Sequence, residues 1–315
     1  MDRNIRNIMK LLLLPVGMFL VFTIIAPGFG FHSIPVIISQ SIIQVVIGFG
    51  LSLLMNAELM DFSMGARTVF AAILGGILSQ SMGLPGLLLG CLTGAMFGAL
   101  LMAVLYQHLK IPVMVVSLGI VMIYEVLGAK LTGSSGYLRI GSDIYQVGSY
   151  PNNIIILILA GVLCYILYYK MRIGCHITAV GNDEKMCRNV GVHADRVKFT
   201  AIMLTGVFCA IAAVLTICYS GAITASTGMG TMGVIFKPIM CVIIGRQMRR
   251  TLDNMPLLIF IGGLCISIIF NGFIAIGLPD ALQDIVLGAF LIIVMGYSSN
   301  SDKITNLYRR LVTVK

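Results

Sequence analysis

Charged residues are scarce in this chain of 315 residues, where they make up only 10% of the positions. Hydrophobic residues account for 58%, and the mean hydropathy is +1.01. An average soluble domain has about 25% charged residues, so lipid must cover much of this surface. A membrane-spanning helix needs about 20 apolar residues, which leaves room for roughly ten such helices and no separate soluble domain. We therefore expect one all-α integral membrane domain over residues 1–315.

The sequence also lacks the motifs of common enzyme and metal sites. It contains no Gly-x-x-x-x-Gly-Lys-Ser/Thr run, so the chain does not bind ATP through a P-loop. The eight cysteines form no Cys-x-x-Cys pair, the four histidines do not cluster, and no nucleophile–base pair is visible. We expect a protein that is not an enzyme, with no catalytic residue, no metal site and no cofactor of its own.

The net charge of +9 does not indicate nucleic acid as a partner, because no basic run is interleaved with aromatic residues. Cytoplasmic loops of membrane proteins collect Lys and Arg. With the N-terminus in the cytoplasm and alternating spans, 17 of the 21 Lys and Arg residues lie inside and Arg67 lies within a span. Only Lys130, Arg139 and Lys237 fall outside or near the outer face. We expect both termini in the cytoplasm.

Ten apolar windows define the expected spans. The first follows basic residues but shows no small-x-small cleavage pattern, so we expect an uncleaved helix rather than a signal peptide. The windows are separated by short gaps, as in a bundle of helical hairpins. They lie near residues 8–27, 35–55, 62–79, 84–106, 111–130, 152–169, 199–219, 226–245, 256–276 and 281–297.

Small residues and prolines recur at informative positions within these windows. Glycine at positions 90, 94 and 98 places small residues on one helix face, which allows close approach of another helix. Leu84-Pro85 and Met255-Pro256 open the fourth and ninth spans, and Ile111-Pro112 and Leu278-Pro279 open the fifth and tenth. The members of each pair run in opposite directions under this topology, which favours the inverted repeats common in transport proteins.

The longest charged interruption lies at residues 171–198, on the cytoplasmic side. Asn182 is a suitable N-cap for a helix inside this loop. Asp183 and Glu184 would then lie in the first turn, where the helix dipole favours acidic side chains, and Arg188 would lie in the last.

Gly191 can adopt the left-handed conformation that ends such a helix. We expect a helix from about residue 183 to 190, with Met186, Cys187 and Val190 available to the groove of a partner protein. An amphipathic helix lying on lipid headgroups is an equally good interpretation of the same pattern.

Two further segments carry polar groups at membrane depth. The first is the break from Asn56 to Ser63, where Asp61 has a structural or pathway role or lies in a solvated loop. The second is the Gly- and Thr-rich stretch at residues 222–233, since irregular segments are tolerated where protein or water lines them and often border a substrate path. Our candidates for polar groups along that path are Asn56, Asp61, Ser63, Ser117, Thr227 and Asn271.

Three stretches of the chain follow the sequence pattern of one known family. The first is the cytoplasmic loop, with Ala179-Val180-Gly181-Asn182-Asp183-Glu184-Lys185 followed by Arg188-Asn189-Val190-Gly191-Val192. The second is Asp61-Phe62-Ser63-Met64-Gly65, where that family has Asp-Leu-Ser-Val-Gly, and the third is Leu109-Lys110-Ile111-Pro112. Together these stretches resemble the ribose-type permeases of bacterial ATP-binding-cassette (ABC) importers. The matches occur in family order, and the resemblance covers about residues 35–297.

The resemblance implies the ten-helix, inverted-repeat fold of type II ABC importer permeases, in the lipid of the bacterial cytoplasmic (inner) membrane. The implied partners are a second permease subunit, cytoplasmic ATP-binding subunits that hold ATP and Mg, and an extracytoplasmic solute-binding protein. The implied solute is a monosaccharide or a related polyol, with nucleosides or a sugar-like signal molecule as neighbours. The residues that would couple to the ATPase are Gly181, Asn182, Asp183, Glu184, Arg188 and Gly191.

One stretch departs from the pattern of that family. Where the family has Gly-Gly-x-x-x-x-Gly-Gly, this chain has Ile244-Gly245-Arg246-Gln247-Met248-Arg249-Arg250, with three positive charges. This difference leaves open how the local gate works, which solute is carried and whether the chain is fully competent for transport. An alternative function is an ion-coupled secondary transporter without an ATPase, in which Asp61 or Glu125 carries a proton or a sodium ion; a membrane scaffold or an enzyme with a buried site is a third.

Overall fold

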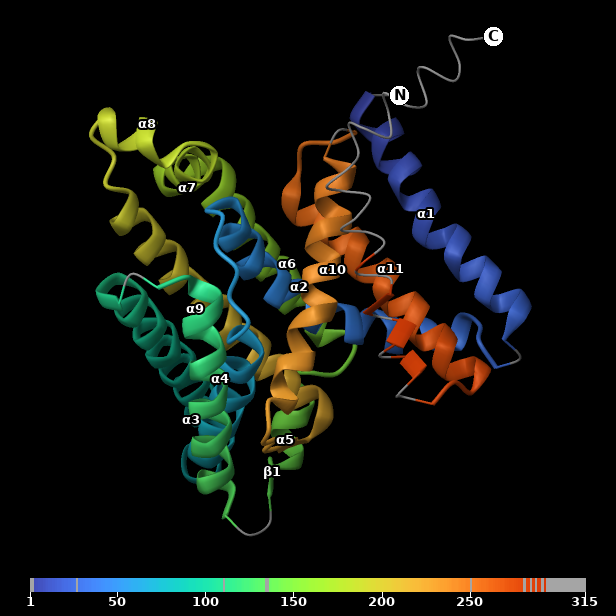
Figure 1. Cartoon of the computed structure of the whole chain (residues 1–315). Helices are drawn as coiled ribbons and strands as arrows, with labels where there is room; N and C mark the ends of the chain where they lie inside the picture. Colours follow the sequence, from blue (N-terminus) through green and yellow to red (C-terminus); the bar gives the residue numbers. More distant parts are fainter. Residues whose placement is uncertain are drawn as a thin grey trace, which may run out of the picture.

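The computed structural model describes residues 3–292 apart from residues 27, 110, 134, 135, 250, 280, 281, 284, 287, 290 and 291. Nearly all of the regular structure is helical (Figure 1). The helices are α1 (Arg3–Ile25), α2 (Ile34–Asn56), α3 (Met64–Leu109), α4 (Val113–Thr132), α5 (Ser142–Tyr145), α6 (Asn152–Tyr165), α7 (Arg172–Asn182), α8 (Glu184–Asn189), α9 (Ala194–Ser220), α10 (Gly233–Met248) and α11 (Met255–Ile276). A π-helical segment (Ile166–Lys170) extends α6, and two short strands, β1 (Tyr137–Arg139) and β2 (Ala222–Thr224), pair antiparallel.

Within the described residues, eight helices are long and apolar enough to cross a membrane, which confirms the all-α integral membrane class. The expected number of about ten spans is not confirmed. Two of the expected spans are both contained in α3, which has 46 residues, and the expected tenth span (residues 281–297) lies mostly outside the described residues.

Helix α3 is two antiparallel spans joined at Gly83, whose φ of 64° and ψ of −141° break the helix. The second half packs on the first through the expected glycine face. A Cβ at Gly90 would lie 2.6 Å from the Cα of Gly75, and one at Gly94 would lie 2.9 Å from the Cα of Ala71. Side chains at these positions would separate the two halves, so the small residues allow the backbones to touch.

On one side of the molecule, polar contacts hold the ends of several helices together. The Asn7 side chain of α1 donates to the Thr251 carbonyl after α10, at 2.8 Å. Arg246 near the end of α10 donates to Asn56 at the end of α2, and α7 abuts the same residue through Gly181. Helices α7 and α8 lie at the top of Figure 1, while β1 and α5 lie at the opposite end.

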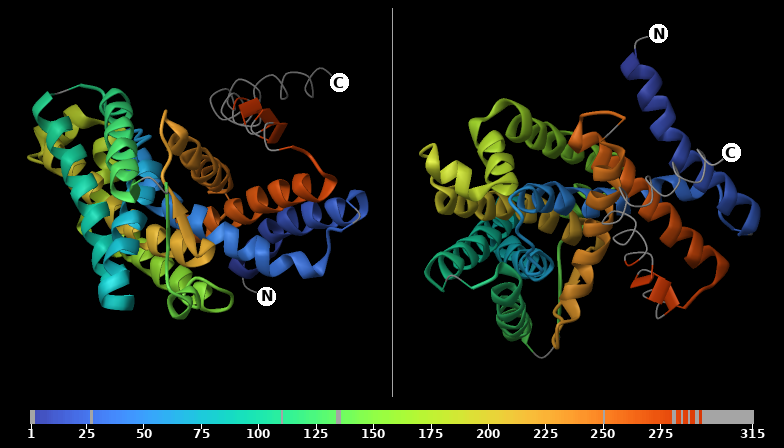
Figure 2. Two further views of the ribbon diagram at one scale, coloured as in Figure 1. Left: turned by 90° about the horizontal axis from the view of Figure 1, so that it is seen from below. Right: turned by 45° about the horizontal axis from the view of Figure 1, so that its top comes forward.

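Helix α9 is the centre of the bundle and packs against both α2 and α3. Its interior face is rich in small residues, and a Cβ at Gly206 would lie 2.8 Å from Ala99 of α3. Phe208 of α9 meets Phe49 of α2 edge to face, with ring centroids 6.2 Å apart. Figure 2 shows α1 and α11 on one flank of this centre and α3 with α4 on the other.

The contact between the two halves of α3 yields a stability prediction. Replacing Gly90 by leucine places a branched side chain against the Gly75 backbone, and such overpacking costs about 1–3 kcal/mol. We expect the Gly90→Leu protein in detergent to unfold at a lower temperature than the parent. Gly119→Leu is the matched control, because a Cβ at Gly119 of α4 meets nothing within 4 Å. Equal unfolding temperatures for both variants would contradict the packing described here.

Candidate functional site

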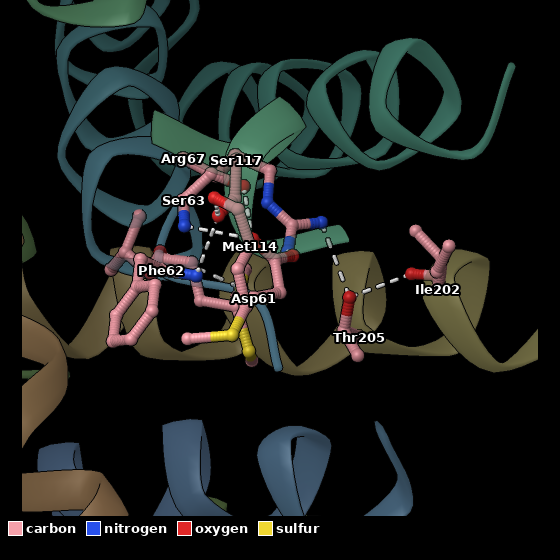
Figure 3. A network of polar contacts seen from close by, with 11 residues as sticks. Asp61, Phe62, Ser63, Arg67, Met114, Ser117, Ile202 and Thr205 are labelled. Atoms are coloured by element: carbon pink, nitrogen blue, oxygen red, sulfur yellow. Dashed lines mark hydrogen bonds and ion pairs between the residues drawn. The ribbon is translucent and has the colours of Figure 1, made fainter. Parts of the chain in front are cut away.

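The non-helical segment between α2 and α3 contains a fully buried ion pair. Nη2 of Arg67 donates to Oδ2 of Asp61, and both side chains are 0% exposed (Figure 3). The other carboxylate oxygen, Oδ1, accepts from the backbone nitrogen of Ser63 at 2.7 Å and from the Ser63 hydroxyl at 2.6 Å. The Asp61 carboxylate therefore has donors on both oxygens, which is what a charge inside a membrane protein requires.

Two neighbouring helices complete this cluster. Nη1 of Arg67 donates to Oγ1 of Thr205 on α9 at 3.2 Å, and the backbone nitrogen of Phe62 donates to Oγ of Ser117 on α4 at 3.2 Å. Figure 3 shows these side chains pointing toward one another from the segment, α3, α4 and α9. The solvated-loop interpretation of Asp61 is therefore wrong, and Asp61 has a structural role.

Glu125 of α4 forms a second buried polar contact, near the opposite end of the bundle. Its carboxylate accepts from the backbone nitrogens of Met229 and Thr231 at 2.7 and 2.8 Å, and from the Thr231 hydroxyl at 2.6 Å. It thereby fixes the irregular chain between β2 and α10, in which Thr227 is exposed. Sequence reasoning named Glu125 only as an ion carrier and missed this role, although an acidic residue within a span signals a polar partner.

The structure brings some of the expected pathway residues together and leaves the others apart. Asp61, Ser63 and Ser117 share the cluster of Figure 3. Elsewhere, the Asn271 amide donates to Oε1 of Gln40 at 2.8 Å. Asn56 lies on the side of α7 and Thr227 on the opposite side, so a pathway role for all six residues stays a prediction.

The charged loop at residues 171–198 contains two helices instead of the single one expected. Residues 172–182 form α7, so Asn182 ends one helix and does not cap the next. Asp183 is the N-cap of α8, and its Oδ1 accepts from the Met186 backbone nitrogen at 2.9 Å. Gly191 ends α8 with a φ of +85°, as expected, and its nitrogen donates to the Arg188 carbonyl.

A chain of ion pairs holds α8 onto the start of α9. Lys198 donates to Oε2 of Glu184 at 2.6 Å, and Arg188 donates to Oε1 of Glu184 at 2.8 Å and to Asp195 at 3.2 Å. These residues line a polar cleft of about 460 Å³ together with Tyr106 of α3. The hydrogen bond from Lys198, together with Arg188, holds the pKa of Glu184 below its usual value.

Apolar side chains on α8 and directly after it face solvent at the tip of this loop. Met186 is 64% exposed and Val190 is 73% exposed. Cys187, which sequence reasoning grouped with them, is only 6% exposed because it packs inward and is not available to a partner. A surface of two large apolar side chains on a capped, ion-paired helix is suited to binding another protein.

In the part of the chain that the structure describes, no group of three or more His, Cys, Asp or Glu side chains lies close enough to hold a metal ion.

The buried ion pair yields a prediction about stability. Removing one partner leaves an uncompensated buried charge, which costs about 3–5 kcal/mol, whereas removing both costs much less. We expect Asp61→Asn and Arg67→Met each to lower the unfolding temperature strongly in detergent. The double variant should lie closer to the parent than the more damaged single variant. Additive losses in the double variant would show that the two side chains do not act as a pair.

The ion pairs of α8 yield a prediction about pH. Because folding lowers the pKa of Glu184 below its ordinary value, its stabilising contribution is present at every pH above that ordinary value. The contribution is lost as pH falls through the lower folded-state pKa. A spin label at Val190→Cys should therefore become more mobile as the pH is lowered from neutrality to below about 4, the ordinary range of a glutamate side chain. Glu184→Gln should be mobile throughout this range, and an unchanged parent signal would contradict the ion-pair model.

Comparison with protein families gives one match that covers most of the chain. Residues 33–295 match the model of a family described as "Branched-chain amino acid transport system / permease component". This range includes the Asp61 cluster, Glu125, and helices α7 and α8.

The chain is similar to several import permeases, over most of its own length and of theirs. The autoinducer 2 import system permease protein LsrC of Photorhabdus luminescens is 24% identical, over 85% of this chain and 82% of its own. LsrD of Salmonella typhimurium is 22% identical over 79% and 78%, and the galactose/methyl galactoside import permease protein MglC of Haemophilus influenzae is 22% identical over 84% and 85%. No solved structure matches the chain. With its apolar helices and the match over residues 33–295, the chain belongs to this family of sugar and branched-chain amino acid ABC permeases, as a multi-pass transport subunit of the inner membrane and not an enzyme.

Proposed function

We propose that residues 1–315 form a single permease domain that carries a small sugar-like solute, a monosaccharide or a related molecule, across the inner membrane. The proposal is supported by the names of the similar permeases, which concern autoinducer 2 and galactose or methyl galactoside. The chain pairs with a second permease subunit, so that the two together enclose the path. ATP and Mg are bound by separate ATPase subunits, and an extracytoplasmic protein delivers the solute.

Both termini lie in the cytoplasm in this proposal, together with α7 and α8. The basic residues support this orientation, because Lys170, Arg172, Lys185 and Arg196 all lie between the end of the π-helical segment and the first turns of α9. Placing that end outside would expose the richest run of positive charge to the wrong side of the membrane.

Helix α8 is the part of the chain that binds the ATPase. This assignment rests on the exposed side chains of Met186 in α8 and of Val190 directly after it. The Asp183 cap and the Glu184 ion pairs fix the helix before a partner arrives, which lowers the entropic cost of binding. The proposed interface keeps Asn182, Asp183, Glu184, Arg188 and Gly191 of the expected set and adds the two apolar side chains. Gly181 is left out, because it is buried against the Asn56 backbone.

The alternative of an ion-coupled transporter requires a carboxylate that can take up a proton or a sodium ion. The oxygens of Asp61 are already bound by Arg67 and Ser63, and those of Glu125 by Met229 and Thr231. Loading an ion at either site would break several buried hydrogen bonds, each of which is costly to leave unmade. The contacts therefore favour ATP-driven transport over ion coupling.

The variant Met186→Asp tests whether α8 binds the ATPase subunit. Replacing an exposed apolar side chain by a charge should leave folding intact but weaken the complex, and a buried interface anchor contributes about 2 kcal/mol or more. We expect co-purification with the ATPase subunit and solute uptake to fall together. Asn189→Asp is the matched control, because it adds the same charge to the same helix at an exposed polar position. Undiminished co-purification of Met186→Asp would refute the assignment.

A further inference from the structure

Asn56 lies where three helices meet, namely α2, α7 and α10. It is the last residue of α2, and the segment that carries Asp61 follows it directly. Helix α7 approaches so closely that a Cβ at Gly181 would lie 1.8 Å from the Asn56 carbonyl oxygen. The two backbones are in direct contact, so a displacement of α7 toward α2 must move the end of α2, because packed backbones cannot interpenetrate.

Arg246 attaches α10 to the same residue. Its Nη2 donates to the side-chain oxygen of Asn56 at 2.5 Å. Among the described residues, no carboxylate lies within ion-pair distance of this half-buried guanidinium, in contrast to Arg67, Arg188 and Arg249. The Asn56 amide is thus the one hydrogen-bond acceptor that the described side chains give it, and a hydrogen bond to a charged group is stronger than a neutral one.

Helices α10 and α11 form a hairpin whose backbones are in close contact. A Cβ at Gly262 would lie 2.5 Å from the Cys241 carbonyl oxygen, and one at Gly245 would lie 3.0 Å from the Ile259 nitrogen. A force applied at Arg246 therefore acts on the hairpin as a unit. The hairpin is joined at its far end to the chain that Glu125 holds, through Thr231.

We propose that Arg246 is a positioning residue that transmits displacements of α7 and α8 through Asn56 to the α10–α11 hairpin. The proposal rests on the proposed function, in which α8 receives the motion of the ATPase. Arg246 provides a defined side-chain link between the ends of α2 and α10. Its removal leaves α8 bound to its partner but uncouples the hairpin from it.

The test measures the hairpin's movement in the assembled complex with its ATPase subunits. Spin labels at Leu88→Cys of α3 and Ile274→Cys of α11, both exposed, report the distance between the two flanks. The background carries Cys175→Ser, because Cys175 is the exposed one of the eight cysteines. Distances are compared with ADP and with ATP plus vanadate, and assembly is followed by a cross-link from Met186→Cys to the ATPase.

We expect a nucleotide-dependent distance change in the parent. Arg246→Gln and Asn56→Ala should each reduce the shifted population about tenfold, an effect within reach of one charge-assisted hydrogen bond. The Met186 cross-link should be retained in both. Asn56→Asp gives Arg246 a carboxylate partner and should preserve the change. Arg249→Gln is the matched control, since Arg249 is exposed, close to Arg246 in sequence, and pairs with Asp253.

The outcomes separate this inference from the function on which it rests. An undiminished distance change in Arg246→Gln and Asn56→Ala, with the cross-link present, overturns the role of Arg246. A parent complex without the Met186 cross-link overturns the seat of α8 itself. If Arg246→Gln does not assemble, Asn56→Ala decides, because it removes the same hydrogen bond and leaves the arginine in place.

Discussion

The ion pair between Asp61 and Arg67 is the contact on which the arrangement of the helices around α9 depends. The chain between α2 and α3 is not helical, and backbone groups at membrane depth cannot be satisfied by lipid. The Asp61 carboxylate accepts from the backbone nitrogen of Ser63, and the Ser117 hydroxyl accepts from that of Phe62. Arg67 extends the contact to Thr205 of α9. The pair therefore joins the buried segment and α3 to α9, in addition to the contact of small residues between α3 and α9.

Two other irregular stretches follow the same principle. Glu125 satisfies two backbone nitrogens ahead of α10, and Asp183 satisfies one at the start of α8. In each case a carboxylate binds backbone donors that a helix leaves open at its N-terminal side. Three non-helical parts of the permease are therefore each fixed by a single acidic side chain.

Periodic and local features could be predicted from the sequence, whereas distant pairings could not. The glycine face at residues 90, 94 and 98 and the left-handed Gly191 follow from spacing and backbone chemistry. The cap of α8 was assigned to Asn182, because the sequence alone does not reveal that α7 continues through that residue and leaves Asp183 as the cap. Contacts such as Glu125 with Thr231, or Arg246 with Asn56, join residues more than a hundred positions apart, and only tertiary packing brings them together.

Helix α7 is a short rigid rod between the α8 tip and the end of α2. Its 11 residues span about 16 Å, since an α-helix rises 1.5 Å per residue. Its contact at Gly181 lies one residue from its C-terminal end, next to α8, while its other end joins the π-helical extension of α6. A push on α8 would therefore meet α2 within one residue of the junction between α7 and α8, and not through the length of α7.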